Sequence, residues 1–399
     1  MLDATPRDRA KGLLTTASGR SDVPPFMVMD VMAAAARIEA AGGHVIHMEV
    51  GQPAASAPKT AILAARAALD SGRIDYTAAL GTPSLRERIA RHYRDSYGFA
   101  VDPGRIVVTT GSSAAFILAF LAMFEPGDRV GVTIPGYPPY RHILTALGCE
   151  PVLIETSSET RHALTGEALL AAHRKAPLKG VLVASPANPT GTMMSRAALS
   201  SLISAAEGAG IRFISDEIYH GLDYAFPAVT AAELSTDALV INSFSKYFCM
   251  TGWRIGWMLV PEPLVRPIER LQQNLAISVP TLSQIAAEAA FDGFAEMEEI
   301  KRGYLENRRI LIEGLPRAGL TKFLPADGAF YLYADVSDFT SDSFEFAGLM
   351  LEKAHVAATP GVDFDPVHGR QFIRFSYARS ALEMREAVER IARWLKRRG

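Results

Sequence analysis

The sequence has little cysteine, no excess of charge of either sign and no long apolar run. Its 399 residues include two cysteines, Cys149 and Cys249, without the paired spacing that would indicate a zinc site or a disulfide framework. The nine histidines also lack metal-ligand spacing, so we expect no metal centre. With 41 basic and 43 acidic residues the net charge is −2, which provides no broad positive field for nucleic acid.

Two further absences concern the cellular context. The N-terminal stretch MLDATPRDRAKGLL lacks the apolar core of a signal peptide. No run approaches the ~18 apolar residues that a membrane span needs. We therefore expect a cytoplasmic protein that binds neither a membrane nor nucleic acid. The hydrophobic content of 49% and the charged content of 21% are typical of a globular chain.

Helical segments alternate with short apolar runs from about residue 60 to about residue 260. The runs that we predict as strands are Arg105–Thr109, Arg129–Thr133, Pro151–Glu155, Gly180–Ala184, Ile211–Ser215, Leu239–Asn242 and Ile255–Val260. Helical stretches separate most of them, for example Ser113–Phe124, Tyr140–Leu147 and Ser195–Ala209. Strands that are apolar on both faces predict a mostly parallel sheet covered by helices on both sides. In such α/β folds, ligands bind beyond the carboxyl ends of the strands.

The pattern changes near residue 280. A long helical stretch runs from Thr281 towards Leu315, and three strand candidates and a final helix from Ser380 to Arg397 follow it. A helix over Phe26–Ala41 precedes the alternating region. We interpret residues 51–280 as a large domain and residues 1–50 with 281–399 as a smaller α+β domain.

A lysine with unusual neighbours follows one of the predicted strands. Lys246 comes just after the apolar run at 239–241, two hydroxyl groups precede it at Ser243 and Ser245, and Arg254 follows eight residues later. A lysine at the end of a buried strand is poorly solvated, which makes its neutral amine accessible for Schiff-base formation. Hydroxyl groups and an arginine suit a phosphate. Together they indicate pyridoxal phosphate, an aldehyde that carries a phosphate.

Two turns after other predicted strands add to this interpretation. Gly111, Ser112 and Ser113 follow one strand and open a helix, whose free N–H groups and dipole favour a phosphate. A Gly-Ser turn with a serine N-cap is an equally good explanation of that segment alone. Asn188 lies in the turn Ser-Pro-Ala-Asn-Pro-Thr-Gly, where it could donate to a phenolate oxygen or simply belong to a proline-rich turn.

Three charged or polar residues occupy further strand positions. Asp216 ends a predicted strand and Tyr219 follows three residues on. The aspartate could cap a helix, or it could pair with a protonated pyridine nitrogen and so help the ring accept electrons. Arg374 lies within the apolar run Phe-Ile-Arg-Phe-Ser, where it could face solvent at a sheet edge or bind a carboxylate through two hydrogen bonds.

Taken in order, these residues resemble the fold-type I pyridoxal-phosphate enzymes of the class I/II aminotransferase family. The motifs that carry the resemblance are Ser-x-Ser-Lys followed by Thr-Gly-Trp-Arg-x-Gly, and Asn-Pro-Thr-Gly. Both are highly specific to that family, and the resemblance covers nearly the whole chain from Pro25 onward.

The resemblance implies a role for each of these side chains. Lys246 would hold pyridoxal 5′-phosphate as a Schiff base and would then move the proton between the substrate Cα and the cofactor. Asp216 would pair with the pyridine nitrogen, while Asn188 and Tyr219 would hydrogen-bond the phenolate oxygen. Tyr137 matches the aromatic residue that stacks on the cofactor ring.

It also implies the sites for the phosphate, the substrate and a second subunit. The phosphate site would comprise Gly111, Ser112, Ser113, Ser243, Ser245 and Arg254. Arg374, helped by the backbone near Gly51, would bind the substrate α-carboxylate. Tyr76 matches a tyrosine that reaches the phosphate of the neighbouring subunit, which implies a homodimer with active sites at its interface.

The expected reaction is transamination of an L-amino acid with a 2-oxo acid such as 2-oxoglutarate or pyruvate. Aspartate-specific relatives of the most similar subgroup have a lysine near the position of Ser113 or Ala114, where this chain has no basic residue. The side chains of Phe26, Met27 and Met29 would suit a neutral or apolar donor. We therefore expect such a donor to be favoured over aspartate.

Two other functions are compatible with parts of this pattern. A pyridoxal-phosphate-dependent C–S or β-lyase would use the same lysine and aspartate on the same scaffold. A regulator built on an aminotransferase-like domain would usually carry a DNA-binding domain at its front. Fewer than about thirty residues precede the first predicted scaffold helix, which is too few for such a domain.

Overall fold

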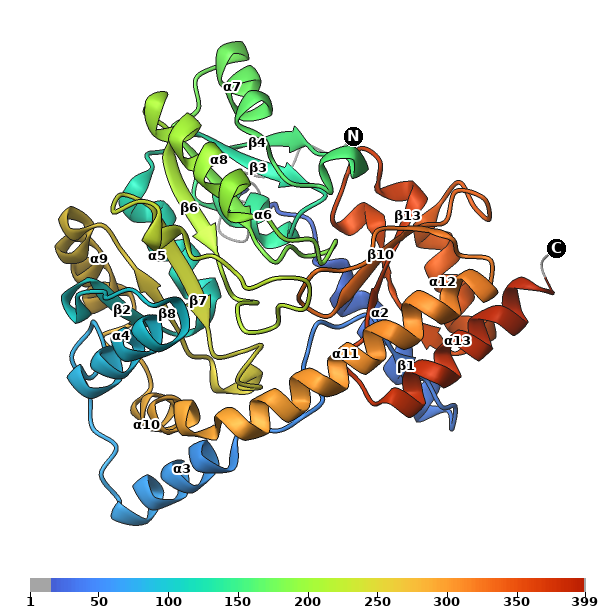
Figure 1. Ribbon diagram of the computed structural model, residues 1–399, viewed down its shortest axis with the longest axis horizontal. Coiled ribbons are helices and arrows are strands. Elements are labelled where there is room, and N and C mark those ends of the chain that lie inside the picture. The colour runs from blue at the N-terminus through green and yellow to red at the C-terminus, as the bar shows by residue number, and fades with distance from the viewer. Residues whose placement is uncertain (1–15, 398–399) are drawn as a thin grey trace, which may run out of the picture.

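The computed structural model describes residues 16–397, and its larger lobe is built on a seven-stranded sheet (Figure 1). The strand order is β2-β8-β7-β6-β5-β3-β4. These strands are β2 (Ile106–Thr109), β3 (Arg129–Ile134), β4 (Glu150–Glu155), β5 (Gly180–Ala184), β6 (Arg212–Asp216), β7 (Leu239–Ser243) and β8 (Gly256–Leu259). Strand β8 is antiparallel to both of its neighbours and the other pairs are parallel, which confirms the predicted mostly parallel sheet.

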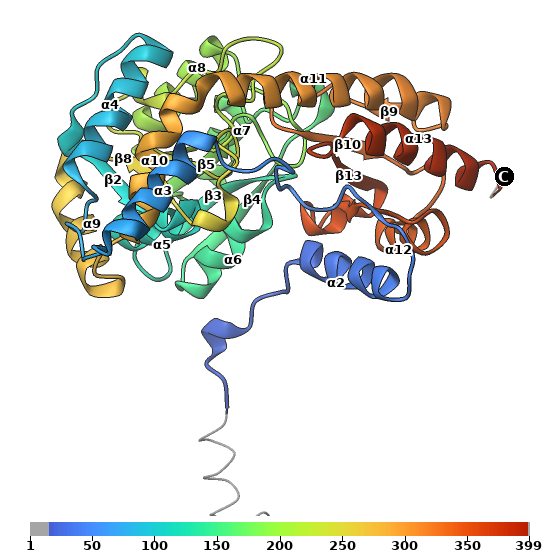
Figure 2. The same cartoon turned by 90° about the horizontal axis from the view of Figure 1, so that it is seen from below.

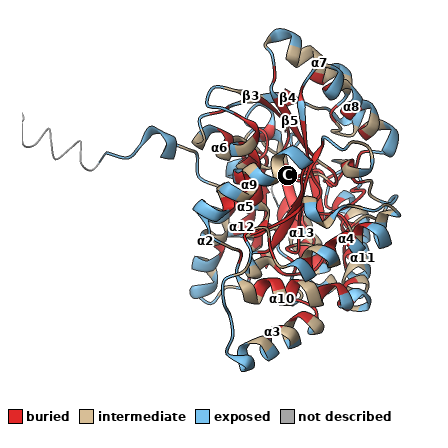
Figure 3. Cartoon of the chain, turned by 90° about the vertical axis from the view of Figure 1, so that its left-hand side faces the viewer, coloured by how far each residue is buried: buried red, intermediate tan, exposed pale blue. Residues whose placement is uncertain are grey.

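Helices cover both faces of this sheet. Within β5, Val181 and Val183 join one buried cluster, whereas Leu182 between them joins another on the opposite face. The first cluster includes α4 (Pro83–Tyr97), α7 (Gly166–Lys175) and α8 (Arg196–Gly208); the second includes α5 (Gly111–Met123), α6 (Pro138–Ala146) and α9 (Glu262–Leu275). Burial on both faces explains why the strands are continuous apolar runs, and buried residues follow the sheet in Figure 3.

The smaller lobe contains a four-stranded antiparallel sheet of order β12-β13-β10-β9. These strands are β9 (Lys322–Phe323), β10 (Tyr331–Asp335), β12 (Thr359–Pro360) and β13 (Phe372–Ser376). The early strand β1 (Ile46–His47) pairs in parallel with β11 (Val356–Ala357). The remaining helices of this lobe are α2 (Met27–Ala40), α12 (Ser343–Ala354) and α13 (Ala381–Leu395). The predicted domain boundaries near residues 50 and 281 stay a prediction.

Helix α11 (Phe294–Arg317) runs along both lobes (Figures 1 and 2). The sequence predicted one helical stretch from Thr281, but the structure has α10 (Thr281–Ala290) and α11 separated by a 3₁₀ turn, Phe291–Gly293. At Gly293 the backbone passes so close to Pro58 that a Cβ would lie 2.4 Å from the proline Cβ. Helix α10 packs against α3 (Lys59–Ser71). Within residues 16–397 no helix combines the length and apolarity needed to cross a membrane.

Candidate active site

A cavity of about 230 Å³ lies at the carboxyl edge of the large sheet and is closed by residues of the smaller lobe. Parallel strands end at one edge, so residues that follow β2, β5, β6 and β7 meet there. The sequence-predicted residues that line the cavity are Gly51, Ser112, Ser113, Tyr137, Asn188, Asp216, Tyr219, Ser245, Lys246, Arg254 and Arg374. Of the described residues, no group of three or more is arranged to hold a metal ion.

Lys246 reaches into this cavity from the loop after β7. Its Nζ donates a hydrogen bond of 2.7 Å to the Gly51 carbonyl oxygen and lies 5.8 Å from the centre of the Tyr219 ring. Burial, and then the positive charges of Arg374 and Arg254, lower the pKa of Lys246 from 10.5 to about 8, although Asp216 opposes this shift. A substantial fraction of the lysine is therefore a neutral amine near pH 8, the form that attacks carbonyl carbons.

Asp216 ends β6 at the bottom of the cavity, where it is almost fully buried. The Tyr140 hydroxyl donates to its Oδ2, and the Ile218 N–H donates to its Oδ1 at 3.1 Å. Burial raises the pKa of Asp216 from 3.8 to about 7, and these two hydrogen bonds hold it lower than burial alone would. Such a carboxyl group would be fixed in its ionised form by a cationic partner in the cavity.

The beginning of α5 and Arg254 form a positive corner of the cavity. Gly111 starts the helix with φ +73°, and a Cβ there would lie 2.5 Å from Arg254 Nη2, so only glycine lets the guanidinium approach. No side chain caps this helix N-terminus, and Ser112 and Ser113 lie in its first turn and line the cavity. Free N–H groups, hydroxyls and a guanidinium are the groups that bind a phosphate.

Arg374 is the innermost cation of the cavity and is 2% exposed. Its Nη1 donates to Asn188 Oδ1 at 2.9 Å, and its Nη2 donates to the Glu49 carbonyl oxygen and, at 3.2 Å, to Thr359 Oγ1. The guanidinium carbon lies 4.4 Å from the centre of the Tyr331 ring. Its Nε is buried without a hydrogen-bond partner. This fixed guanidinium, with a donor to spare, is suited to a carboxylate.

Three predicted site residues, Gly111, Ser243 and Tyr76, are not among those that line the cavity, although Gly111 adjoins it through Arg254. Ser243 is buried, with its Oγ 2.9 Å from Ser245 Oγ and 3.1 Å from the Ile255 carbonyl oxygen, so it contacts the cavity only through Ser245. Tyr76 is 80% exposed and lies on the surface. Its predicted contact with a neighbouring subunit stays a prediction.

Sequence reasoning missed two tyrosines that line the cavity. Tyr140 donates a hydrogen bond to Asp216. The only indication in the sequence was that Tyr140 lies on α6 about one helical turn after Tyr137, the N-cap residue of that helix. Tyr331 begins β10, and its hydroxyl lies 2.7 Å from that of Tyr219. A Cβ at Gly51 would lie 1.7 Å from the Tyr331 hydroxyl oxygen, so the backbone there must be glycine. No local pattern indicates a contact between residues so far apart in sequence.

The two-lobed α/β fold, with a lysine after a central strand opposite a buried aspartate, defines the class of fold-type I pyridoxal-phosphate enzymes. A family model described as aminotransferase class I and II matches residues 43–391, and the chain belongs to this family. The predicted fold class, family and enzyme class are thereby confirmed.

Relatives agree with this assignment. The chain is 48% identical, over 380 residues, to valine–pyruvate aminotransferase of Mycobacterium tuberculosis, covering 94% of this chain and 97% of that protein. The crystal structure of an aminotransferase from Mycobacterium tuberculosis superposes with a TM-score of 0.93 at 47% identity, covering 96% and 99% of the two chains. Aspartate aminotransferase from Thermus thermophilus with maleate gives 0.89 at 32% identity, covering 95% and 99%. These relatives favour transamination over the lyase alternative.

Proposed function

We propose that this enzyme uses pyridoxal 5′-phosphate to move the amino group of an L-amino acid with a neutral, apolar side chain to a 2-oxo acid such as pyruvate or 2-oxoglutarate. The observation that carries the proposal is the single cavity shared by Lys246, Asp216 and Arg374. An amine with a lowered pKa, a buried carboxyl group and a buried guanidinium are the three groups that this chemistry requires of a protein.

The cavity fits the cofactor at each of its functional groups. The corner formed by Gly111, Ser112, Ser113, Ser245 and Arg254 would hold the phosphate, because it offers a close-packed guanidinium and an uncapped helix N-terminus. Asp216 would face the ring nitrogen, Asn188 and Tyr219 the phenolate oxygen, and Tyr137 the ring face. Asn188 can donate there because its Oδ1 already accepts from Arg374, which leaves its amide N–H₂ free to turn outward.

The chain's own residues would divide the work of the reaction. When bound, pyridoxal phosphate supplies an aldehyde that takes up the amino group and a ring that accepts the electrons left when the substrate Cα loses its proton. Lys246 Nζ is the base that takes this proton, and its lowered pKa makes the neutral amine available near pH 8. Arg374 holds the substrate carboxylate and so fixes the direction of the Cα–H bond towards the lysine. Asp216 keeps the ring nitrogen protonated.

The walls of the cavity support a neutral donor. Phe26, Val28 and Met29 line the side near the smaller lobe, and the Phe26 ring packs edge-on against Tyr137 at 5.8 Å. Met27, which we also expected there, is not among the lining residues and donates its backbone N–H to Asp363. A substrate with a second carboxylate would meet these apolar groups on that side of the cavity. The valine–pyruvate activity in the name of the Mycobacterium tuberculosis relative is in line with this choice.

A screen of half-reactions tests the proposal. Purified enzyme loaded with the cofactor is mixed with single amino acids, and loss of the absorbance of the bound cofactor is followed. We expect valine, leucine and similar donors to react faster than aspartate, and a 2-oxo acid to restore the absorbance. No reaction with any amino acid would refute transamination, and fastest reaction with aspartate would refute the donor class. Release of ammonia and pyruvate from cysteine-type substrates without an acceptor would instead indicate a lyase.

Replacement of the lysine tests the assigned base. Lys246→Ala should abolish transamination while the enzyme still binds the phosphate end of the cofactor. The matched control is Lys353→Ala, a change of an exposed lysine in α12 that is paired only with Glu352, and it should leave the rate unchanged. Transamination retained by Lys246→Ala would contradict its role.

We also propose that the enzyme works as a cytoplasmic homodimer. Apolar side chains are exposed at Leu63 and Leu69 on α3, at Ile74 just after it, at Leu275, which ends α9, and at Ile277 beyond it. The exposed Tyr76 follows Ile74 two residues later. Residues 16–25 project from the body of the molecule in Figure 2 and are mostly exposed, with the turn Gly19–Ser21 in contact with α6, as a segment that packs mainly on a second subunit would. Sedimentation should show a dimer; a monomer with full activity would rule out shared active sites.

A further inference from the structure

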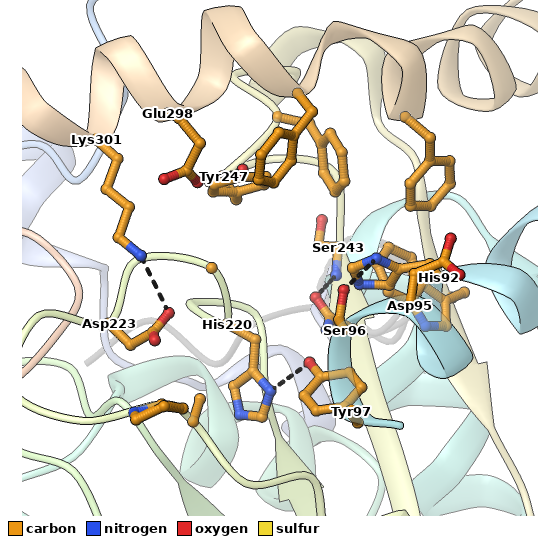
Figure 4. Close-up of a pocket in the computed structure, with 18 of the residues that line it drawn as sticks. His92, Asp95, Ser96, Tyr97, His220, Asp223, Ser243, Tyr247, Glu298 and Lys301 are labelled. Carbon is orange, nitrogen blue, oxygen red and sulfur yellow. Dashed lines mark hydrogen bonds and ion pairs between the residues drawn. The ribbon is translucent and has the colours of Figure 1, made fainter. Parts of the chain in front are cut away.

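A second cavity, of about 460 Å³, lies beneath α11 and is separate from the cavity that Lys246 lines. Helix α4 contributes His92, Asp95 and Ser96, and α11 contributes Glu298 and Lys301 (Figure 4). Further walls come from the turn after β6 and the loop after β7. Its volume is within the range of small-molecule sites.

The two cavities share their dividing wall. In the turn after β6, Tyr219 lines the candidate active site, whereas His220 lines the second cavity. In the loop after β7, Lys246 lines the active site and its neighbour Tyr247 the second cavity. At Gly221, with φ +90°, a Cβ would lie 2.6 Å from the Tyr247 ring, so the two loops pack without a gap. A molecule in the second cavity would therefore press on the loop that carries Lys246.

The inner wall of the second cavity is aromatic and also carries the cation Arg88, whose guanidinium carbon lies 4.5 Å from the centre of the Phe291 ring. The His92 ring is 5.2 Å from Phe291, 6.2 Å from Trp257 and 6.4 Å from Phe248. Burial lowers the pKa of His92 to about 4, so the ring is neutral at physiological pH. His220 has both ring nitrogens in hydrogen bonds, one with the Tyr97 hydroxyl at 2.7 Å (Figure 4) and one with the Ser185 carbonyl oxygen at 2.9 Å. Such a wall suits an apolar side chain.

The outer wall carries charges of both signs close together. Lys301 Nζ is 3.5 Å from Asp223 Oδ1, a distance too long for a strong hydrogen bond, and both side chains are about one-fifth exposed. Glu298, one turn before Lys301 on α11, accepts a hydrogen bond of 2.6 Å from Tyr247 at one of its two carboxylate oxygens. The lysine has three donors and the carboxylates have oxygens to spare. An ammonium and a carboxylate carried on one carbon would match this arrangement.

We propose that the second cavity binds a free α-amino acid with an aromatic or bulky apolar side chain, and that its occupancy alters the affinity of the active site. The carboxylate would lie on Lys301, the ammonium between Glu298 and Asp223, and the side chain against the aromatic wall. The coupling part of the proposal rests on the proposed function, because it is measured on transamination. The binding part does not rest on the proposed function. Coupling between two ligands is reciprocal and is typically about fivefold or more.

Calorimetry with L-phenylalanine tests the binding. The background is Arg374→Gln loaded with the pyridoxamine form of the cofactor, which has no aldehyde to react with an amino acid, so that the active site neither takes up the amino group of phenylalanine nor holds its carboxylate. We expect one site per chain. Adding Glu298→Gln/Lys301→Gln should weaken binding about tenfold or more, because hydrogen bonds to charged groups are lost. The control, Glu299→Gln/Arg302→Gln, should leave binding unchanged, because it alters an exposed acid–base pair with the same spacing on the same helix.

Several outcomes would overturn the proposal. Absence of binding in the background enzyme, or equal binding by Glu298→Gln/Lys301→Gln, excludes the site. Binding of 3-phenylpropanoate or phenethylamine as tight as that of phenylalanine excludes recognition of a zwitterion. Ser96→Trp, a change at an exposed position on the rim, should close the cavity and provides a second test if the paired variant is unstable. Because this calorimetry needs no turnover, it remains decisive even if the enzyme is not a transaminase.

Kinetics test the coupling. Phenylalanine is added to the parent enzyme turning over valine, and to the enzyme with Glu298→Gln/Lys301→Gln. Phenylalanine that competes with valine at the active site raises KM equally in both enzymes. The coupling is therefore the further change in KM that occurs in the parent enzyme and not in Glu298→Gln/Lys301→Gln. We expect that part to be about fivefold. Identical responses of the two enzymes would refute the coupling.

Discussion

Replacing the buried carboxyl group of Asp216 by an amide should stabilise the cofactor-free enzyme and inactivate the loaded one. The pKa of Asp216 is raised from 3.8 to about 7 in the fold, mainly by burial. The folded state therefore holds its proton between about pH 4 and pH 7, where the unfolded state has lost it. As the pH rises through this window, the unfolded state is favoured and stability falls. At 1.36 kcal/mol per pKa unit, the cost at pH 8 is roughly 4 kcal/mol.

Asp216→Asn removes this cost because an amide has no charge to bury. Its oxygen can still accept the hydrogen bond from Ile218, and Tyr140 can turn to accept from the amide. We expect urea unfolding of the cofactor-free variant at pH 8 to give a gain of about 2–4 kcal/mol. The gain should shrink to less than about 1 kcal/mol at pH 4, where the folded parent is protonated and the unfolded parent is roughly half protonated. Asp365→Asn, at a buried carboxyl that accepts two backbone hydrogen bonds, is the control and should give no gain.

The loaded enzyme should respond in the opposite direction. An amide cannot keep the ring nitrogen protonated, and a charge-assisted hydrogen bond is worth about 1.5–3 kcal/mol. We therefore expect the rate of the half-reaction to fall by about tenfold to a hundredfold. A variant that is no more stable than the parent at pH 8 would refute the electrostatic reasoning. A variant that retains the full rate would refute the role of Asp216.

Three other predictions follow from the same cavity. Tyr140→Phe should raise the pKa of Asp216 further and weaken cofactor binding about tenfold, because one hydrogen bond to the carboxylate is lost. Fluorescence titration of the cofactor-free enzyme with the cofactor measures this affinity. The control is Tyr224→Phe, which removes a hydroxyl that donates to the Ala329 carbonyl oxygen and should bind the cofactor normally. Arg374→Lys should raise KM for the amino acid about tenfold or more, since a lysine cannot bind a carboxylate in bidentate fashion; an unchanged KM would contradict the assigned site. Met29→Arg should raise kcat/KM for aspartate relative to valine by adding a cation to the apolar wall, and an unchanged ratio would show that this wall does not contact the side chain.

Much of the fold could be predicted because its signals are local. A strand buried on both faces needs an apolar run, and β3, β5 and β7 are such runs with helices between them. The break between α10 and α11 could not be predicted, because it depends on Pro58 packing against Gly293 from a distant segment. Helix α9 was also missed: it contains Pro267 and carries a polar face along most of its length.

The site shows the same division between local and distant contacts. Lys246, Asp216 and Asn188 were found because each follows a strand, and the carboxyl ends of parallel strands share one edge. Ser243 and Ser245 were both expected at the phosphate site, but the chain turns after β7, so that of these two serines Ser245 lines the cavity and Ser243 does not. Tyr331 was missed because its contact with Tyr219 joins β10 of the smaller sheet to the turn that follows β6 of the large sheet.

The sequence by itself determined the class of enzyme, because Ser-x-Ser-Lys, Thr-Gly-Trp-Arg-x-Gly and Asn-Pro-Thr-Gly place chemically specific side chains within short segments. Only the tertiary structure decided how these side chains behave. The lowered pKa of Lys246 and the raised pKa of Asp216 arise from burial by segments far away in the chain. The approach of Arg374 to Asn188 and the second cavity behind the Lys246 loop likewise depend on how the two lobes pack. Burial and long-range contacts are properties of packing, and a linear pattern of residues does not contain them.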